Sequence, residues 1–189
     1  MTLLQTVRDY RPWNEAEAAD KASFIQFLET FGENVYTRDN FIGHVTVACF
    51  IVNKDRTKAL AAFHNIMQHY AWLGGHADGE RNLAAVALKE IEEESGLKEV
   101  SFVQKEPIDI NVLVVFPHLK HGKNVSAHLH YNLAYLLQAD EQDEIRVKAD
   151  ENSDIKWVSF DELLKLTDVH SAKVYQRIIE KLKYVEAGK

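Results

Sequence analysis

The chain has 189 residues, of which 46% are hydrophobic and 27% are charged, and its formal net charge is −7. This composition is typical of a globular protein of one domain with a short extension, and the acidic balance disfavours a nucleic-acid binder. No apolar stretch approaches the ~20 residues that span a bilayer, the start lacks the features of a signal peptide, and the single cysteine suits a reducing compartment. We expect a cytoplasmic monomer or homodimer that acts on a small molecule, without a membrane partner.

The first predicted element is an amphipathic helix that begins after Asn14 and ends at Gly32. Asn14 is a suitable N-cap, and Glu17, three residues later, completes the pattern of a capping box. The apolar side chains that follow recur at helical spacing: Phe24, Ile25, Phe27, Leu28 and Phe31. We interpret residues 1–39 as a helical extension that packs on a main domain of residues 40–189.

Beyond the extension, short β-branched and apolar runs are typical of strands. The expected strands are His44–Val52, Leu60–His64, Val100–Val103, Ile110–Phe116, Val125–Gln138 and Ile155–Val158. A glycine-rich loop is expected at Trp72–Gly79, with helices from about Glu80 to Ser95, at Phe160–Leu166 and from about Ser171 to Tyr184. Because this order lacks a regular strand–helix alternation, the sequence predicts an α+β fold, an α/β/α sandwich with a mixed sheet between helices.

The segment Gly74–Leu97 carries the strongest chemical signal. Residues three and four positions apart share one face of a helix, so Glu90, Glu93 and Glu94 project together. Clustered carboxylates repel one another unless they are solvated or bridged by cations, and hard oxygen ligands suit Mg²⁺ or Mn²⁺. A solvated acidic surface would explain an isolated run of this kind. The glycines ahead of the helix favour the other interpretation, because they let a polyphosphate approach the main chain.

This segment resembles the signature of the Nudix hydrolase family, to which MutT-like proteins belong. Residues 89–97 match the second half of that signature, with Lys89 in place of the usual arginine. The first half departs from it by one residue. Counting from Gly75 puts Arg81 at the position of the first glutamate, whereas counting from Gly74 puts Glu80 there, and we take Glu80 as the equivalent. Residues 10–40 also resemble the helical extension of one bacterial Nudix subgroup.

The resemblance implies a Nudix pyrophosphohydrolase that cleaves a nucleoside diphosphate-linked small molecule by water attack at phosphorus, with Mg²⁺ or Mn²⁺ as cofactor. By position, it assigns metal and catalytic roles to Glu90, Glu93 and Glu94. Lys89 would orient one of these glutamates. Glu80 and Glu151 are further candidate metal ligands, since the family often keeps an extra carboxylate near the position of Glu151. One of the carboxylates would act as the general base.

A second group of candidate residues lies on the long predicted strand Val125–Gln138. His128, His130 and Asn132 alternate with apolar residues and therefore share one face. That face either lines the substrate pocket or is covered by the N-terminal extension. With the loop residues Gly74, Gly75 and His76, these three residues form the predicted substrate-binding set, although a structural bond to the loop backbone is the favoured role of His76. A separate His-x-His zinc site is disfavoured, because no cysteine or third histidine follows at ligand spacing.

Two other functions share the same fold. A Nudix-fold module that binds or senses a nucleotide with little catalysis would retain the loop but not need the glutamates, and Arg81 and Lys89 leave room for it. Chemistry like that of isopentenyl-diphosphate isomerase would need a catalytic cysteine beside the pocket. Cys49 lies in an apolar run and is a poor candidate for that role.

Overall fold

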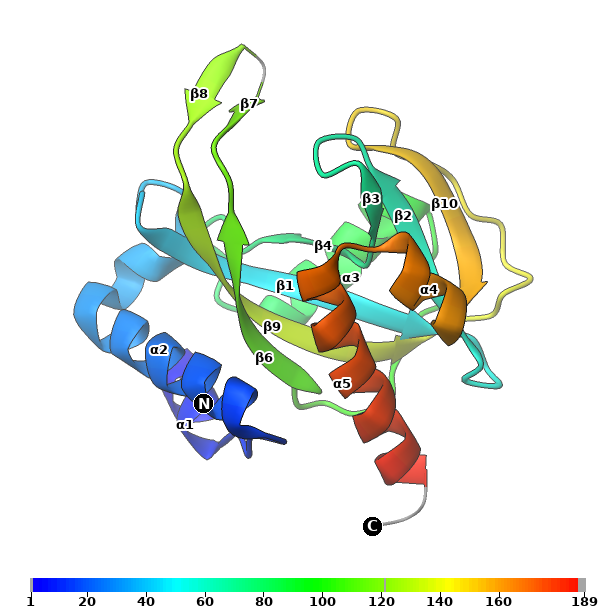
Figure 1. Cartoon of the computed structure of the whole chain (residues 1–189), viewed down its shortest axis with the longest axis horizontal. Coiled ribbons are helices and arrows are strands. Elements are labelled where there is room, and N and C mark those ends of the chain that lie inside the picture. The colour runs from blue at the N-terminus through cyan, green and yellow to red at the C-terminus, as the bar shows by residue number, and fades with distance from the viewer. Residues whose placement is uncertain (1, 121, 187–189) are drawn as a thin grey trace.

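The computed structural model describes residues 2–120 and 122–186, and they form a mixed β-sheet between two layers of helices (Figure 1). The strands are β1 (Gly43–Val52), β2 (Lys58–His64), β3 (His69–Ala71), β4 (Leu73–His76), β5 (Ser101–Phe102), β6 (Asp109–Val115), β7 (His118–Lys120), β8 (Lys123–Val125), β9 (His128–Gln138) and β10 (Asn152–Ser159). The helices are α1 (Leu3–Asp9), α2 (Glu15–Phe31), the 3₁₀ helix η1 (Gly32–Tyr36), α3 (Leu83–Ser95), α4 (Phe160–Leu166) and α5 (Val169–Glu186). The predicted α+β class is confirmed.

The sheet is built around a parallel pair, β1 and β9, that runs through its centre. Its hydrogen-bonded order is β10-β2-β1-β9-β5, while β6 also pairs with β9, β4 with β1 and β3 with β2. The register places His44 of β1 beside His130 of β9. On the other partner of β1, Thr46 lies opposite His76 of β4. Three segments far apart in the sequence therefore meet at one end of β1.

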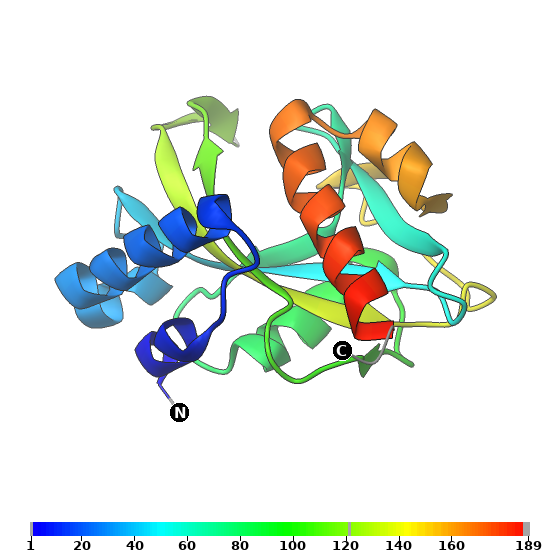
Figure 2. The same cartoon turned by 60° about the horizontal axis from the view of Figure 1, so that its bottom comes forward.

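The alternation of side chains along β1 divides the core into two layers. Val45, Val47 and Cys49 face the layer formed by α1, α2 and α3, where Phe24 of α2 and Ile91 of α3 are fully buried. The alternate residues of β1, from Ala48 to Val52, face α4 and α5 on the other side of the sheet. Figure 2 shows α5 crossing the sheet on the side opposite α3. The buried cysteine is a core residue, and burial raises the pKa of its thiol.

The predicted N-terminal helix is confirmed, with one difference at its start. The Asn14 side chain accepts a hydrogen bond from the backbone N–H of Glu17, as expected of an N-cap. The Glu17 carboxylate does not complete a capping box; it accepts from the Trp13 N–H and from buried Lys181. The Lys181 ammonium of α5 binds this carboxylate more strongly than a second backbone amide would, because a hydrogen bond between charged groups is stronger. The short helix α1, which the sequence pattern does not predict, packs beside α2.

Several predicted boundaries in the rest of the chain differ from the structure, and three of them concern the site. The helix expected from about Glu80 begins at Leu83, because Asn82 is the N-cap and its side chain accepts from the Ala85 N–H. The expected loop at 72–79 contains β4, which pairs with the buried strand β1. The strand expected at 125–138 divides into β8 and β9 around residues 126–127. Within residues 2–120 and 122–186, no helix is both long and apolar enough to cross a bilayer.

Candidate functional site

Two glycines at the end of β4 allow the close packing on which the site depends. A Cβ on Gly74 would lie 2.2 Å from the Val47 carbonyl oxygen, so only glycine lets β4 lie this close to β1. A Cβ on Gly75 would lie 2.3 Å from the carboxyl carbon of Glu90. The Glu90 carboxylate therefore rests directly on the backbone of β4, where any side chain would displace it.

Glu94 is the most firmly held carboxylate of the site. Its Oε2 accepts a hydrogen bond from the Gly74 N–H at 2.8 Å, and its Oε1 accepts from Asn152 Nδ2 of β10 at 3.1 Å. The residue is only 5% exposed. Burial raises the pKa of the Glu94 carboxyl to about 7, the charges of Glu90 and Glu151 add to the rise, and the two hydrogen bonds oppose it. The loop and β10 thus fix a carboxyl group that titrates near neutral pH.

The other two glutamates of the helix differ in their surroundings. Glu90 is half-buried, and burial followed by the charge of Glu93 raises the pKa of its carboxyl. Glu93 is exposed, and its Oε1 lies 3.4 Å from Lys89 Nζ one helical turn away. The contact agrees with the predicted orienting role of Lys89, although such exposed pairs contribute little to stability. One face of α3 therefore carries three glutamates: Glu94 is buried, Glu90 is half-buried and Glu93 is exposed.

Two candidate metal ligands, Glu80 and Glu151, come from outside α3 and differ in how near they lie to this helix face. Glu80 is exposed on the turn before α3, where its Oε1 accepts from the Asn82 N–H. Arg81 points elsewhere and pairs with Glu33 at 2.6 Å. Glu151 is half-buried, and its charge contributes to the raised pKa of the Glu90 and Glu94 carboxyls. Electrostatically, Glu151 belongs to the same carboxylate group.

Arg38, in the segment between η1 and β1, is a site residue that the sequence interpretation missed. Its guanidinium makes two hydrogen bonds to Asp78, with Nε at 2.7 Å and Nη2 at 2.6 Å. The Asp78 bonds, and also the charges of Glu90 and Glu151, raise the pKa of Arg38. A cation from the N-terminal segment therefore lies near the glutamates. Nothing in the local pattern around residue 38 indicates this, because Asp78 is forty positions away.

The candidate residues of β9, His128, His130 and Asn132, lie on the face of the sheet that is turned toward α5. Their neighbour Tyr131 points to the opposite side, where it stacks on Phe27 of α2 with ring centroids 3.8 Å apart. The alternative in which the N-terminal extension covers the histidine face is therefore wrong. Asn132 is 2% exposed and is held by Thr46 and Asn111.

His128 and His130, nearer the start of β9, lie beside His76 of β4. The Nε2 atoms of His76 and His130 are 3.2 Å apart, and those of His128 and His130 are 3.3 Å apart. Both β9 histidines and His76 are partly exposed. The structure thus joins the predicted loop histidine to the predicted strand histidines, whereas it encloses Asn132 among sheet residues.

The raised pKa of Glu94 predicts a pH-dependent stability for the metal-free chain. A carboxyl whose folded-state pKa exceeds its ordinary value of 4.5 stabilises the fold when protonated, and this contribution is lost as the pH rises through about 7. Relative to Glu94→Gln, the wild type should therefore lose about 3 kcal/mol of unfolding free energy from below pH 4.5 to above pH 7. Denaturant titrations of both proteins across this range would measure the difference. Parallel stability curves for the two proteins would contradict it.

Comparison with known protein families gave one match, to the NUDIX domain, over residues 43–178. This range contains the glycines of β4, helix α3 with its glutamates, β9 and β10. A comparison with curated proteins gave no match.

Several solved structures share the fold. An Ap4A hydrolase from C. elegans aligns with a TM-score of 0.53 and 15% identity, over 77% of this chain and 98% of that one. The dihydroneopterin triphosphate pyrophosphohydrolase of E. coli aligns with a TM-score of 0.55 and 18% identity, over 77% and 96%. A NUDIX-family hydrolase from Clostridium perfringens gives a TM-score of 0.52 and 20% identity, over 74% and 97%. At these identities the likeness shows a common fold.

Proposed function

The chain belongs to the NUDIX domain family. We propose that it is a pyrophosphohydrolase of that family, which uses Mg²⁺ or Mn²⁺ to hydrolyse a pyrophosphate bond in a nucleoside diphosphate-linked or related small molecule. One observation carries the proposal: the Glu90 carboxylate rests on Gly75 while Glu94 accepts the Gly74 N–H. The glycine loop and the acidic helix face therefore form one structure, at which a polyphosphate and its cation would meet.

The donor set suits a hard divalent cation. Glu94 is buried and Glu90 is half-buried. The charge of Glu90 raises the pKa of the Glu94 carboxyl, and the charge of Glu93 raises that of Glu90. A cation would relieve this repulsion, and carboxylate oxygens are the ligands that Mg²⁺ and Mn²⁺ prefer. We propose Glu90, Glu93 and Glu94 as the ligands, with Glu151 and Glu80 as additional ones. When bound, the cation neutralises phosphate charge and lowers the pKa of a coordinated water.

The residues of the chain supply the remaining requirements of the reaction. Glu94, whose carboxyl has a raised pKa without metal and which two hydrogen bonds hold in place, is one candidate general base when the other glutamates hold the cation. Glu90, whose carboxyl pKa is also raised, is the other candidate base. Lys89 holds Glu93 through the contact along the helix. Asn152 and the Gly74 N–H keep Glu94 in one orientation.

On the substrate side, we propose that Gly74, Gly75 and His76 contact the phosphates, with His128 and His130 contacting the adjoining group. Arg38 adds a positive charge opposite the carboxylates, and Asp78 holds two of its five N–H donors. Asn132 is proposed to act through its neighbours, because Thr46 and Asn111 already bind its side chain. We also propose that residues 1–39 are an extension of a domain formed by 40–189, in a cytoplasmic monomer or homodimer that does not act on nucleic acid.

A hydrolysis panel tests the proposed function. The compounds would be Ap4A, dihydroneopterin triphosphate, ADP-ribose, a nucleotide sugar and an oxidised nucleoside triphosphate, each with Mg²⁺ or Mn²⁺, read as phosphate released after phosphatase coupling. We expect turnover of at least one compound by the wild type and none by Glu93→Gln/Glu94→Gln. Tight nucleotide binding by the wild type without turnover would instead support the nucleotide-sensing module.

A further inference from the structure

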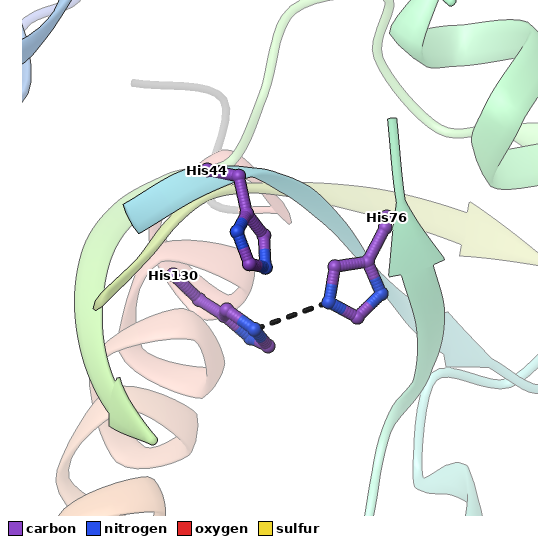
Figure 3. Close-up of side chains that lie close together, drawn as sticks. All are labelled: His44, His76 and His130. Carbon is purple, nitrogen blue, oxygen red and sulfur yellow. Dashed lines mark hydrogen bonds between the residues drawn. The ribbon is translucent and has the colours of Figure 1, made fainter. Parts of the chain in front are cut away.

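Four histidines from three strands gather at one end of the sheet, on the side facing α5. His44 of β1, His76 of β4 and His130 of β9 point toward a common space (Figure 3). One ring nitrogen from each of the three lies within 4.8 Å of those of the other two, and within residues 2–120 and 122–186 they are the one group of three or more histidine, cysteine or acidic residues so arranged. His128 joins them, because its ring centroid is 4.8 Å from that of His44.

Nε2 of His130 lies close to ring nitrogens of two other histidines, although a hydrogen bond accounts for only one such contact. Its Nε2 lies 3.2 Å from Nε2 of His76 and 3.3 Å from Nε2 of His128. A neutral imidazole nitrogen carries either one N–H or one lone pair, so it can form only one good hydrogen bond in the ring plane. Two nitrogens that bind one tetrahedral metal ion at ordinary Zn–N distances are about 3.3 Å apart. Both contacts match this separation.

His44 provides a second, independent observation. It is 5% exposed, and neither ring nitrogen has a hydrogen-bond partner of good geometry, although the backbone of Asn40 is close enough to raise its pKa in part. A buried polar group without a partner destabilises the folded chain. Burial, the largest influence, lowers the pKa of His44 to about 4 and that of His130 to about 2. Both rings are thus neutral at neutral pH, which is the form that binds metal ions.

We propose that His44, His76 and His130, with His128 as a fourth ligand, bind one divalent transition-metal ion, Zn²⁺ foremost. Imidazole nitrogens prefer such ions, whereas the carboxylates of α3 prefer Mg²⁺ or Mn²⁺. The two sites therefore differ in the ions they select, and Zn²⁺ binding does not depend on the hydrolytic activity. With the ion bound, His76, His128 and His130 would hold the metal in place of the direct substrate contacts proposed above. A bound ion would supply the partner that His44 lacks and would tie β1, β4 and β9 together beside Gly75.

Metal titration of the full chain tests this site. The chain would be stripped with EDTA, dialysed and titrated with Zn²⁺ and with Co²⁺, whose visible absorption reports tetrahedral nitrogen ligation. We expect one Zn²⁺ per chain in metal analysis and binding at least 100-fold tighter than that of Mg²⁺. His130→Asn and His76→Asn should each weaken Zn²⁺ binding at least 10-fold, while His170→Asn, an exposed histidine of α5, should leave it unchanged.

Two further measurements keep the test decisive. His76 is partly exposed, so His76→Asn provides a folded variant if His130→Asn does not fold, and the melting temperature in metal-free buffer establishes folding. Glu90→Gln should retain full Zn²⁺ binding. Absence of stoichiometric Zn²⁺ binding, unchanged binding in both histidine variants, or loss of binding in Glu90→Gln would overturn the proposal and leave a hydrogen-bonded imidazole cluster.

Discussion

Replacing Glu90 with glutamine is expected to lower kcat by about 100-fold or more while the protein keeps its fold. The change preserves the shape of a side chain that packs on Gly75, where a Cβ would come within 2.3 Å of its carboxyl carbon. It removes one negative charge from a partly desolvated group of carboxylates. The melting temperature without metal should therefore stay level or rise, while its increase on addition of Mg²⁺ or Mn²⁺ should shrink.

Glu92→Gln is the matched control for this experiment. Glu92 belongs to the same helix and carries the same charge, but it is exposed and lies almost opposite Glu90 around the helix. Steady-state kinetics and metal-dependent melting of both variants would separate the local effect from the loss of net charge. Equal kcat in Glu90→Gln and wild type, or equal losses in both variants, would refute the assignment of Glu90.

Lys181→Met is expected to destabilise the fold by about 3–5 kcal/mol, because it removes the cation that hydrogen-bonds buried Glu17 and leaves that carboxylate with Arg177 at 3.9 Å. Lys181 Nζ lies 2.5 Å from Glu17 Oε1 and 2.7 Å from Asp109 Oδ2, and both carboxylates are fully buried. Arg177 binds Asp109 through two further bonds of 2.7 Å. Although burial alone would raise it, these cations hold the pKa of the Asp109 carboxyl below its ordinary value. For a chain of this length the melting temperature should fall by about 10 °C.

The same helix offers the control for this prediction. Lys173→Met makes the identical change at an exposed position of α5, and it should alter the melting temperature by no more than a degree or two. Glu17→Gln added to Lys181→Met should recover part of the loss, because the unpaired charge is then removed. Denaturant unfolding of the four proteins would measure both effects. A Lys181→Met protein as stable as Lys173→Met would show that the buried pairs are not coupled to folding.

Local patterns in the sequence determined the acidic face and the element that carries it. Glu90, Glu93 and Glu94 share a face because helical spacing alone relates them, and Gly96 ends the helix in a left-handed conformation with φ of 74°. The N-terminal helix and α4 were predicted for the same reason, since their caps Asn14 and Ser159 act within one turn. The start of α3 was misplaced because Glu80 and Asn82 both offer capping oxygens, and only the backbone conformation selects Asn82.

What the tertiary structure alone decided is which distant segments supply the rest of the site. Arg38 reaches it from the segment between η1 and β1, where Asp78 holds it. His44 and His76 reach it through β1 and β4, and the pairing of β1 with β9 and β4 sets their positions. Spacing along the chain disfavours a zinc site, because no cysteine or third histidine follows His128 and His130 at ligand spacing, yet strand register brings two histidines from other strands beside them. Lys181, which donates a hydrogen bond to Glu17, likewise comes from α5 and lies 164 positions away in the sequence. Spacing along a chain encodes neighbours within an element, whereas contacts between elements depend on how the whole sheet packs.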